Sequence, residues 1–287
     1  MFISCQLCKS SFIDFIGRGS KGGSIPPYVT QNIYTTSIQM DYDETFARRG
    51  HMYKYATETY PSVLSTEFQT AVRVCALKPG DTLLNIPAAC VNLEPYLPPG
   101  VNYVRYETNK PFAEMTGVPH CTLSEIPMAD KSVDVILSLA SLHHTTDRER
   151  DTFYTEVLRL LKPGGRLVIG DVMRGSAQDS WLNTFVNMYN SAGHQGRFWS
   201  AEDIELLDYH GFHTRVSIHS YTWPFASESD MLDFCRHLFG LDVATDAKIR
   251  AGIQQFLSPR TEYGRIHIPW QLIYFTSTTA RTHAPTL

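Results

Sequence analysis

The stretch "LLKPGGRLVIGD", residues 160–171, joins the end of a helix to a buried strand. Lys162 and Pro163 stop the helical pattern that precedes them, and the two glycines that follow offer the left-handed backbone of a helix C-cap. "RLVIGD" is then a short apolar run of strand length, typical of a strand covered on both faces. The stretch therefore predicts a helix that leads into a strand of a parallel sheet.

The same alternation extends upstream. "VDVILSLA", residues 133–140, is a second apolar run of strand length, and Thr146 and Glu149 have the spacing of a capping box at the start of the intervening helix. "TLLNIP" (82–87) and "VNYVRYE" (101–107) predict two earlier strands. Strands that alternate with helices form right-handed β-α-β units, so we expect an α/β protein with a doubly wound sheet.

The chain beyond Asp171 predicts further helices and two late strands, "HTRVSIHSY" and "WQLIYFTST". Between these strands we expect a helical insertion, at about 224–262, of the kind that covers a substrate pocket. The pattern favours a helix core for its aromatic residues, with an aromatic-lined acceptor pocket as the alternative. These residues are Trp223, Phe225, Phe234 and Phe239.

The two ends of the chain differ from its centre. Residues 1–39 contain a single acidic residue, Asp14, and we expect them to form a disordered extension. The alternating pattern occupies residues 40–280, and 281–287 form a short tail. A chain that begins at Met40 is predicted to fold.

Composition limits the partners of the protein. A net charge of -4 and a pI near 6.2 give no global basic field, which argues against a nucleic-acid partner. The sequence contains no apolar run of the roughly 18 to 20 residues that a membrane helix needs. Six scattered cysteines favour a cytoplasmic location. Cys5 and Cys8 are not followed by a second ligand pair, so no metal site is expected.

Two segments of the chain, "VDVILSLASLHHTTD" and "LRLLKPGGRLVIGDV", resemble class I S-adenosylmethionine-dependent methyltransferases. The resemblance is greatest to the small-molecule type that includes the ubiquinone and menaquinone methylases. It implies a mostly parallel seven-stranded sheet whose last strand is antiparallel. It also implies S-adenosylmethionine as cofactor at the carboxyl ends of the first strands, and a small-molecule acceptor.

The resemblance weakens at the turn after the first strand. Members of the family carry an acidic residue there, followed by a glycine-rich turn. This chain has Asn85, Pro87, Ala89 and Cys90 at the corresponding positions, without a glycine. A residue with a Cβ in the left-handed conformation costs about 1–2 kcal/mol, so cofactor affinity depends on how this turn folds.

At other cofactor positions implied by the resemblance, this sequence matches the family pattern better than it does at the turn. Glu107 ends the second strand, where a carboxylate accepts hydrogen bonds from both ribose hydroxyls. Thr122 and Leu123 correspond to positions beside the adenine. Ser138 and Leu139 end a later strand, where the methionine part lies.

Methyl transfer from a sulfonium needs alignment and a dry pocket, and a general base only when the acceptor arrives protonated. The candidates for that base are His143, His144 and His194. The first two follow a strand at the ligand edge of the sheet. His194 lies between glycines in "YNSAGHQGRF", a loop that we interpret as a substrate rim. A purely structural histidine is an equal alternative for His143 and His144.

Two function classes therefore stay open. The first is a small-molecule methyltransferase. The second is a relative that kept the fold but lost methyl transfer, acting as a pseudoenzyme, a cyclase or a partner subunit. An NAD(P)-dependent oxidoreductase is excluded because no G-x-G-x-x-G follows the first strand. A nucleic-acid methyltransferase is disfavoured by the acidic balance of the chain.

Overall fold

The computed structural model describes residues 42–88 and 90–279. The predictions for residues 1–39, for Ala89 and for the tail at 281–287 lie outside the described residues. The first helix, α1, spans Tyr42–Thr59.

A seven-stranded sheet forms the centre of the described part, with the strand order β2-β1-β3-β4-β7-β5 and with β6 paired to β7. The first four strands in this order run parallel, whereas β7 is antiparallel to both β4 and β5. This confirms the predicted α/β sheet with an antiparallel last strand. The strands are β1 (Thr82–Asn85), β2 (Asn102–Arg105), β3 (Val133–Leu139), β4 (Leu161–Asp171), β5 (Phe212–Phe225), β6 (Arg260–Glu262) and β7 (Arg265–Thr279).

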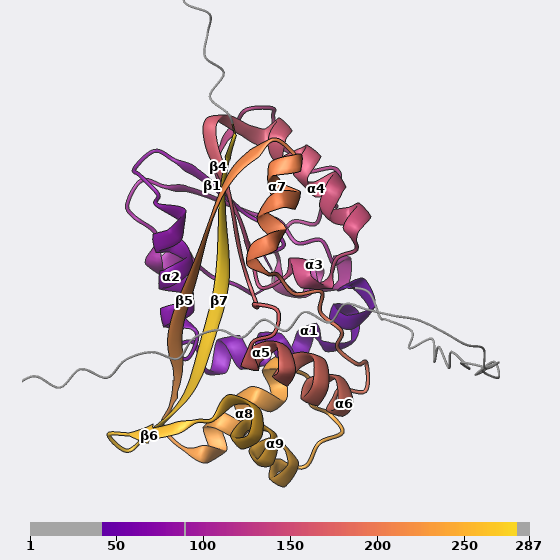
Figure 1. The fold of residues 1–287 in the computed structure, drawn as a ribbon, viewed down its shortest axis with the longest axis vertical. Helices are drawn as coiled ribbons and strands as arrows, with labels where there is room; N and C mark the ends of the chain where they lie inside the picture. The colour runs from indigo at the N-terminus through magenta and orange to yellow at the C-terminus, as the bar shows by residue number, and fades with distance from the viewer. Residues whose placement is uncertain (1–41, 89, 280–287) are drawn as a thin grey trace, which may run out of the picture. The chain divides into compact units, whose positions relative to one another are not determined.

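Helices cover both faces of the sheet. In Figure 1, α2 lies on one side of the strands and α4 and α7 lie on the other. Strand residues alternate between these sides: Leu83 and Val135 pack in the core with α2, and Leu84 and Ile136 pack in the core with α4. The other helices are α2 (Ser65–Cys75), α3 (Lys110–Thr116), α4 (Asp147–Leu160), α5 (Ala177–Ser180), α6 (Asn187–Tyr189), α7 (Ile204–Tyr209), α8 (Glu228–Leu238) and α9 (Asp246–Gly252).

Local sequence signals set several helix ends. Thr146 and Glu149 form the predicted capping box of α4. Ser200 opens the segment that leads into α7, and Gly211 ends it with φ +90°. After β1 the chain forms a 3-10 turn at Glu94–Tyr96.

The C-terminal helices α8 and α9 lie between β5 and β7 in the chain, close to the predicted insertion. Its predicted start is slightly early, because β5 stays paired with β7 through Phe225. The helix-core prediction for Trp223 and Phe225 is therefore wrong, since both belong to this strand. Trp223 instead stacks on Trp270 of β7, with ring centroids 4.0 Å apart and an interplanar angle of 20°. Phe234 of α8 is buried as predicted.

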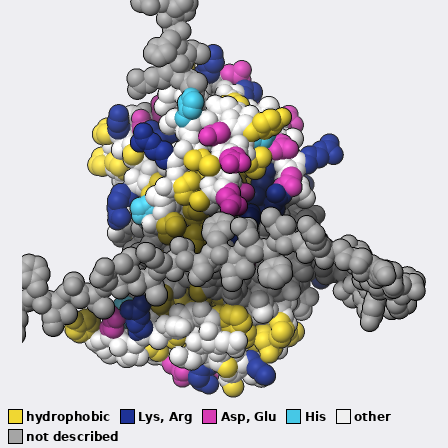
Figure 2. Space-filling view, in the orientation of Figure 1, with side chains coloured by type: hydrophobic (Ala, Val, Ile, Leu, Met, Phe, Trp, Pro, Cys, Tyr) yellow, Lys and Arg dark blue, Asp and Glu magenta, His cyan; other side chains and the backbone are white. Residues whose placement is uncertain are grey.

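The described surface carries charges of both signs. Figure 2 shows Lys and Arg side chains intermixed with Asp and Glu on the face in view. Within residues 42–88 and 90–279, no helix combines the length and the apolar character needed to cross a bilayer.

Candidate active site

A cavity opens at the carboxyl ends of β3 and β4, the edge where open α/β sheets bind ligands. Its empty space measures about 870 Å³ with the opening to solvent included. α1, the loop after α6 and the end of α8 with the turn that follows it complete its walls. The residues that matter most for its chemistry are Tyr53, Glu67, His143, His194, Trp223 and Trp270.

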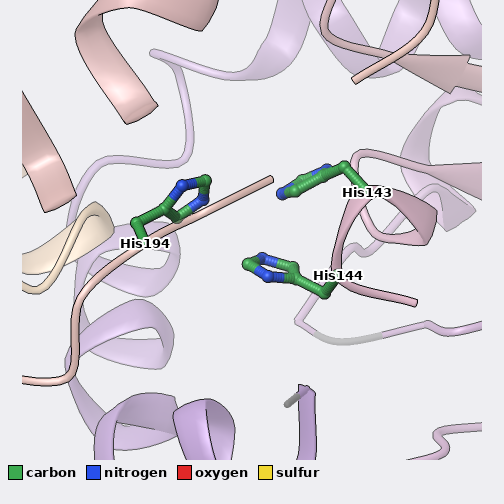
Figure 3. A group of neighbouring side chains, drawn as sticks. All are labelled: His143, His144 and His194. Atoms are coloured by element: carbon green, nitrogen blue, oxygen red, sulfur yellow. The ribbon is translucent and has the colours of Figure 1, made fainter. Parts of the chain in front are cut away.

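All three predicted histidines meet in this cavity. His143 and His144 come from the 3-10 turn Leu142–His144 after β3, and His194 comes from the loop after α6. One ring nitrogen of each histidine lies within 4.8 Å of a ring nitrogen of the other two. Figure 3 shows the three rings around a common space. The structure thus joins residues that the sequence offered as separate candidates.

Asp171, the last residue of β4, holds His143 in one orientation. Its Oδ1 lies 2.7 Å from His143 Nδ1, and both side chains are buried. The same carboxylate accepts hydrogen bonds from the backbone N–H groups of His143 and Val172. Because a carboxylate only accepts, Nδ1 of His143 carries a hydrogen, and Nε2 is the ring nitrogen left for other partners.

Asn183 positions His194 in a comparable way. Its Oδ1 lies 3.4 Å from His194 Nδ1 and accepts a hydrogen bond from the Gly196 backbone N–H. Its amide nitrogen donates to the Gly196 carbonyl. The loop is therefore tied to the helical segment below it, and Nδ1 of His194 faces an acceptor.

A buried arginine links the two segments that carry the histidines. The Arg150 guanidinium donates to the Leu142 carbonyl and to the Arg197 carbonyl, and it lies over the Trp199 ring with its central carbon 4.5 Å from the ring centroid. The backbone of Arg197 in turn donates to the His143 carbonyl. Arg150 is thus a positioning residue that fixes the spacing of the cluster.

The cavity favours uncharged imidazoles. Desolvation inside the cavity lowers the pKa of His194 to about 3 and holds the pKa of His144 well below its usual range. The neighbouring histidines add to the effect, since each charged ring would repel the next. His144 and His194 are therefore neutral at pH 7.

Another part of the cavity lining is aromatic and contains one acid. Trp223 and Trp270 stack there, and Phe239 lies 5.9 Å from Trp270 between ring centroids. Glu67 of α2 accepts a hydrogen bond from Trp223 Nε1 at 3.3 Å. Burial raises the pKa of Glu67 to about 7, so the acid is close to half protonated at neutral pH.

Helix α1 covers the edge of the sheet beside this cavity. Its Phe46 stacks on Phe112 of α3 with ring centroids 5.3 Å apart, and Tyr53 meets the same ring edge-on at 6.2 Å. Burial beside acidic groups raises the pKa of Tyr53, which keeps the phenol neutral.

The glycine-free turn shows no left-handed residue among Asn85–Ala88 and Cys90. The conformational penalty considered for a turn without glycine therefore does not arise at these positions. Asn85 is buried; its Nδ2 donates to Tyr103 Oη at 3.1 Å, and its Oδ1 has no protein partner. A buried acceptor without a partner is what a cofactor amine or hydroxyl would satisfy.

Glu107 is fully buried at the end of the β2 segment. Its Oε1 accepts hydrogen bonds from the backbone N–H groups of Thr108 and Asn109, at 2.8 and 2.9 Å. Asn109 in turn caps α3 through its side chain. Glu107 therefore supports the local backbone in addition to any role with a ribose.

The remaining predicted cofactor positions differ in exposure. Ser138 and Leu139 are buried at the end of β3, and Ser138 Oγ lies 3.0 Å from Ser141 Oγ. Leu123 packs in the core, whereas Thr122 is exposed, with its hydroxyl 3.2 Å from Ser124 Oγ. These side chains lie at or near the predicted edge without lining the histidine cavity.

Two functional candidates were missed from the sequence. Asp171 was assigned only to the strand that defines the fold, although an acid at the carboxyl end of a buried strand is a signal for the ligand edge. Glu67 stands next to apolar positions of a helical pattern, with Leu64 and Phe68 as neighbours. An acid on an apolar helix face was the available sign of a buried carboxyl group.

Comparison with known proteins agrees with this geometry. Residues 96–169 match the family model described as "Methyltransferase domain". The chain is 36% identical to the uncharacterised protein YafE of Escherichia coli K12 over 85 residues, 29% of this chain and 40% of YafE. It is 32% identical to a probable S-adenosylmethionine-dependent methyltransferase of Mycolicibacterium smegmatis over 98 residues, 33% of this chain and 34% of that protein. Each match therefore spans less than half of the relative's length.

The fold matches solved structures over a larger share of the chain. YcgJ of Bacillus subtilis superposes with a TM-score of 0.52 at 16% identity, covering 75% of this chain and 98% of YcgJ. The sheet and its ligand-edge cavity thus define a class I methyltransferase fold. Residues 96–169 therefore match a methyltransferase family model, and the described part of the chain has the class I methyltransferase fold.

Proposed function

We propose that this chain transfers a methyl group from S-adenosylmethionine to a small-molecule acceptor bound in the histidine-lined cavity. The observation that carries the proposal is the cavity itself, which places three histidines and an aromatic wall at the ligand edge of a methyltransferase sheet. Displacement at a sulfonium needs alignment and exclusion of water, and a largely apolar pocket favours both.

The cofactor would lie along the carboxyl ends of β1, β2 and β3. Asn85 Oδ1 offers an unpartnered buried acceptor there, and Glu107 offers a carboxylate at the ribose position. The main chain at Ser138 and Leu139 would border the methionine part. When bound, S-adenosylmethionine supplies an activated methyl group on a positively charged sulfur. These residues fit such a ligand, because acceptors match its hydroxyl and amine donors.

The acceptor would be a flat or apolar molecule with one ionisable group. Trp223 and Trp270 provide a stacking surface for it. Glu67 lies against Trp223 and would bind a hydroxyl or amine donor of the same molecule. Since uncompensated burial of an acid is unfavourable, a donor that satisfies Glu67 would be selected over a purely apolar analogue.

A histidine of the cluster would remove the acceptor's proton as a general base. The hydrogen bond from Nδ1 of His143 to Asp171 leaves Nε2 as the nitrogen that would meet the acceptor. His144 and His194 keep the space free of positive charge, which favours a nucleophilic oxygen or nitrogen over a competing anion. This assigns His143 as the best oriented of the three candidates.

The alternative without methyl transfer was supported mainly by the glycine-free turn. The described residues of that turn carry no left-handed strain, so this reason for a lost cofactor is weaker than the sequence suggested. We therefore favour the active enzyme.

Calorimetric titration of the full chain with S-adenosylmethionine, and separately with S-adenosylhomocysteine, tests the proposal. We expect micromolar binding of both ligands. Replacing Asn85 by Leu should weaken this binding at least tenfold, whereas Asn102→Leu, at an exposed position of β2, should leave it unchanged. Absence of binding up to millimolar concentrations would overturn the proposed function. If binding occurs, transfer of labelled methyl groups to a panel of phenols and aromatic amines would identify the acceptor class.

A further inference from the structure

The histidine cluster has the composition of a metal site. His143, His144 and His194 come from two segments about fifty residues apart, yet one nitrogen of each lies within 4.8 Å of the others. Three imidazoles with an open fourth position are a recurrent ligand set for catalytic zinc. No metal site was expected from the sequence, because the only pair with ligand spacing, Cys5 and Cys8, lacks a second pair.

The groups behind the ligands support this interpretation independently. Metal-bound histidines commonly donate their second ring N–H to a carboxylate or carbonyl, which fixes the ring and the tautomer. His143 has such a partner in the buried Asp171, at 2.7 Å. His194 has Asn183 Oδ1 at 3.4 Å from its Nδ1. In both residues the second nitrogen, Nε2, is therefore the one that can coordinate.

The site requires only small adjustments to close. Zn–N bonds of about 2.0–2.1 Å in a tetrahedron place ligand nitrogens roughly 3.3 Å apart, and the present separations reach 4.8 Å. The His194 ring can rotate toward the other two rings, since its contact with Asn183 Oδ1 is long, at 3.4 Å. The fourth position would open into the aromatic cavity, where the acceptor is proposed to bind.

We propose that His143, His144 and His194 bind one divalent transition-metal ion, zinc in the first instance, whose open coordination position faces the cavity. The ion would coordinate an oxygen or nitrogen of the acceptor and lower the pKa of its proton. With metal bound, His143 Nε2 acts as a ligand, and the acceptor proton leaves to solvent from the coordinated group. Only this role depends on the proposed function; the binding of the ion does not.

The test is titration of the chelator-treated, untagged full chain with Co²⁺ and Zn²⁺. We expect one equivalent of Co²⁺ to give visible absorption bands of a tetrahedral nitrogen site, and one equivalent of Zn²⁺ to displace it. His194→Ala should weaken zinc binding at least a hundredfold. His213→Ala, at an exposed histidine of β5, is the matched control and should bind as the wild type does.

Two further variants make the result specific. Cys5→Ser/Cys8→Ser should still bind one equivalent; loss of binding in that variant would place the metal at the cysteines and overturn the proposal. Asp171→Asn should retain the site with affinity reduced about 10- to 100-fold. Thermal melts of each variant show whether it is folded. Zinc binding that is weaker than millimolar, or that is unaffected by His194→Ala in a folded protein, would also overturn the proposal.

The same samples separate this inference from the proposed function. Titration of the metal-free and zinc-loaded chain with S-adenosylmethionine reports cofactor binding on its own. Zinc binding without cofactor binding supports the metal site and contradicts the methyltransferase activity. Cofactor binding without zinc binding supports the activity and contradicts the metal site.

Discussion

Asp171 Oδ1 lies 2.7 Å from His143 Nδ1, and this buried pair connects the end of the central strand β4 to the cavity. The strand that defines the fold therefore also fixes the tautomer of a candidate catalytic histidine. Fold stability and site geometry depend on the same carboxylate, which makes it the most informative position to change.

Asp171→Ala is expected to destabilise the protein by about 3 kcal/mol, because it leaves the backbone N–H groups of His143 and Val172 without their acceptor. Chemical denaturation measures this change. Asp151→Ala, which removes an exposed acid paired with His210, should cost less than about 1 kcal/mol. Equal losses in the two variants would contradict the structural role of Asp171.

Glu67 should make stability depend on pH. The native carboxyl has a pKa raised to about 7 by burial, whereas the unfolded chain titrates near 4.5. Between these values the native state binds more protons, so the free energy of unfolding falls as pH rises and levels off above pH 7. The full effect of one such group is on the order of 3 kcal/mol.

Glu67→Gln removes this titration. Its free energy of unfolding should increase relative to the wild type as pH rises from about 4.5 to 8, measured by urea denaturation at each pH. Glu205→Gln, at an exposed acid of α7, should follow the wild-type curve. A constant difference between Glu67→Gln and wild type across this range would show that the native Glu67 pKa is not raised.

Glu107→Gln should weaken S-adenosylmethionine binding at least tenfold with little change in thermal stability, because the amide oxygen still accepts from the backbone but the charge is lost. Glu107→Ala should in addition destabilise the fold, since two N–H groups, that of Asn109 buried, lose their acceptor. Calorimetry and melting curves distinguish the two effects. Glu114→Gln, at an exposed acid of α3, is the control; unchanged affinity in Glu107→Gln would remove this residue from the cofactor site.

Gly50 allows α1 to approach α3 closely. A Cβ at Gly50 would lie 2.6 Å from Phe112 Cδ2, and Phe112 is fully buried. Gly50→Ala should therefore destabilise the protein by about 1–3 kcal/mol, despite the higher helix propensity of alanine. In a Phe112→Leu background the loss should be smaller by at least about 0.5 kcal/mol. Additive losses in the double-mutant cycle would show that the two positions do not meet.

The alternation of strands and helices was predictable because its signals are local. The apolar run at 133–139, the capping box at Thr146 and Glu149, and the stop at Lys162 and Pro163 each act within a few residues. Trp223 was misplaced for the same reason. Its strand exists because β5 pairs with β7, a partner more than forty residues away, and no local pattern records that pairing.

The candidate site was likewise only partly predictable from the sequence. The sequence offered all three histidines, but as separate candidates for one base. It did not connect them to one another, to Asp171 or to the aromatic wall. The cavity brings these groups together from α1, α2, β3, β4 and the C-terminal strands, so its membership is a property of long-range packing.

The sequence by itself determined the order of the elements, the ligand edge and the family resemblance, because backbone propensities and apolar periodicity act over short distances. Tertiary structure alone decided which side chains share the cavity and which protonation states they hold. Desolvation and neighbouring charge set the pKa of His194 and of Glu67, and both effects come from residues that are distant in the chain and adjacent only after folding.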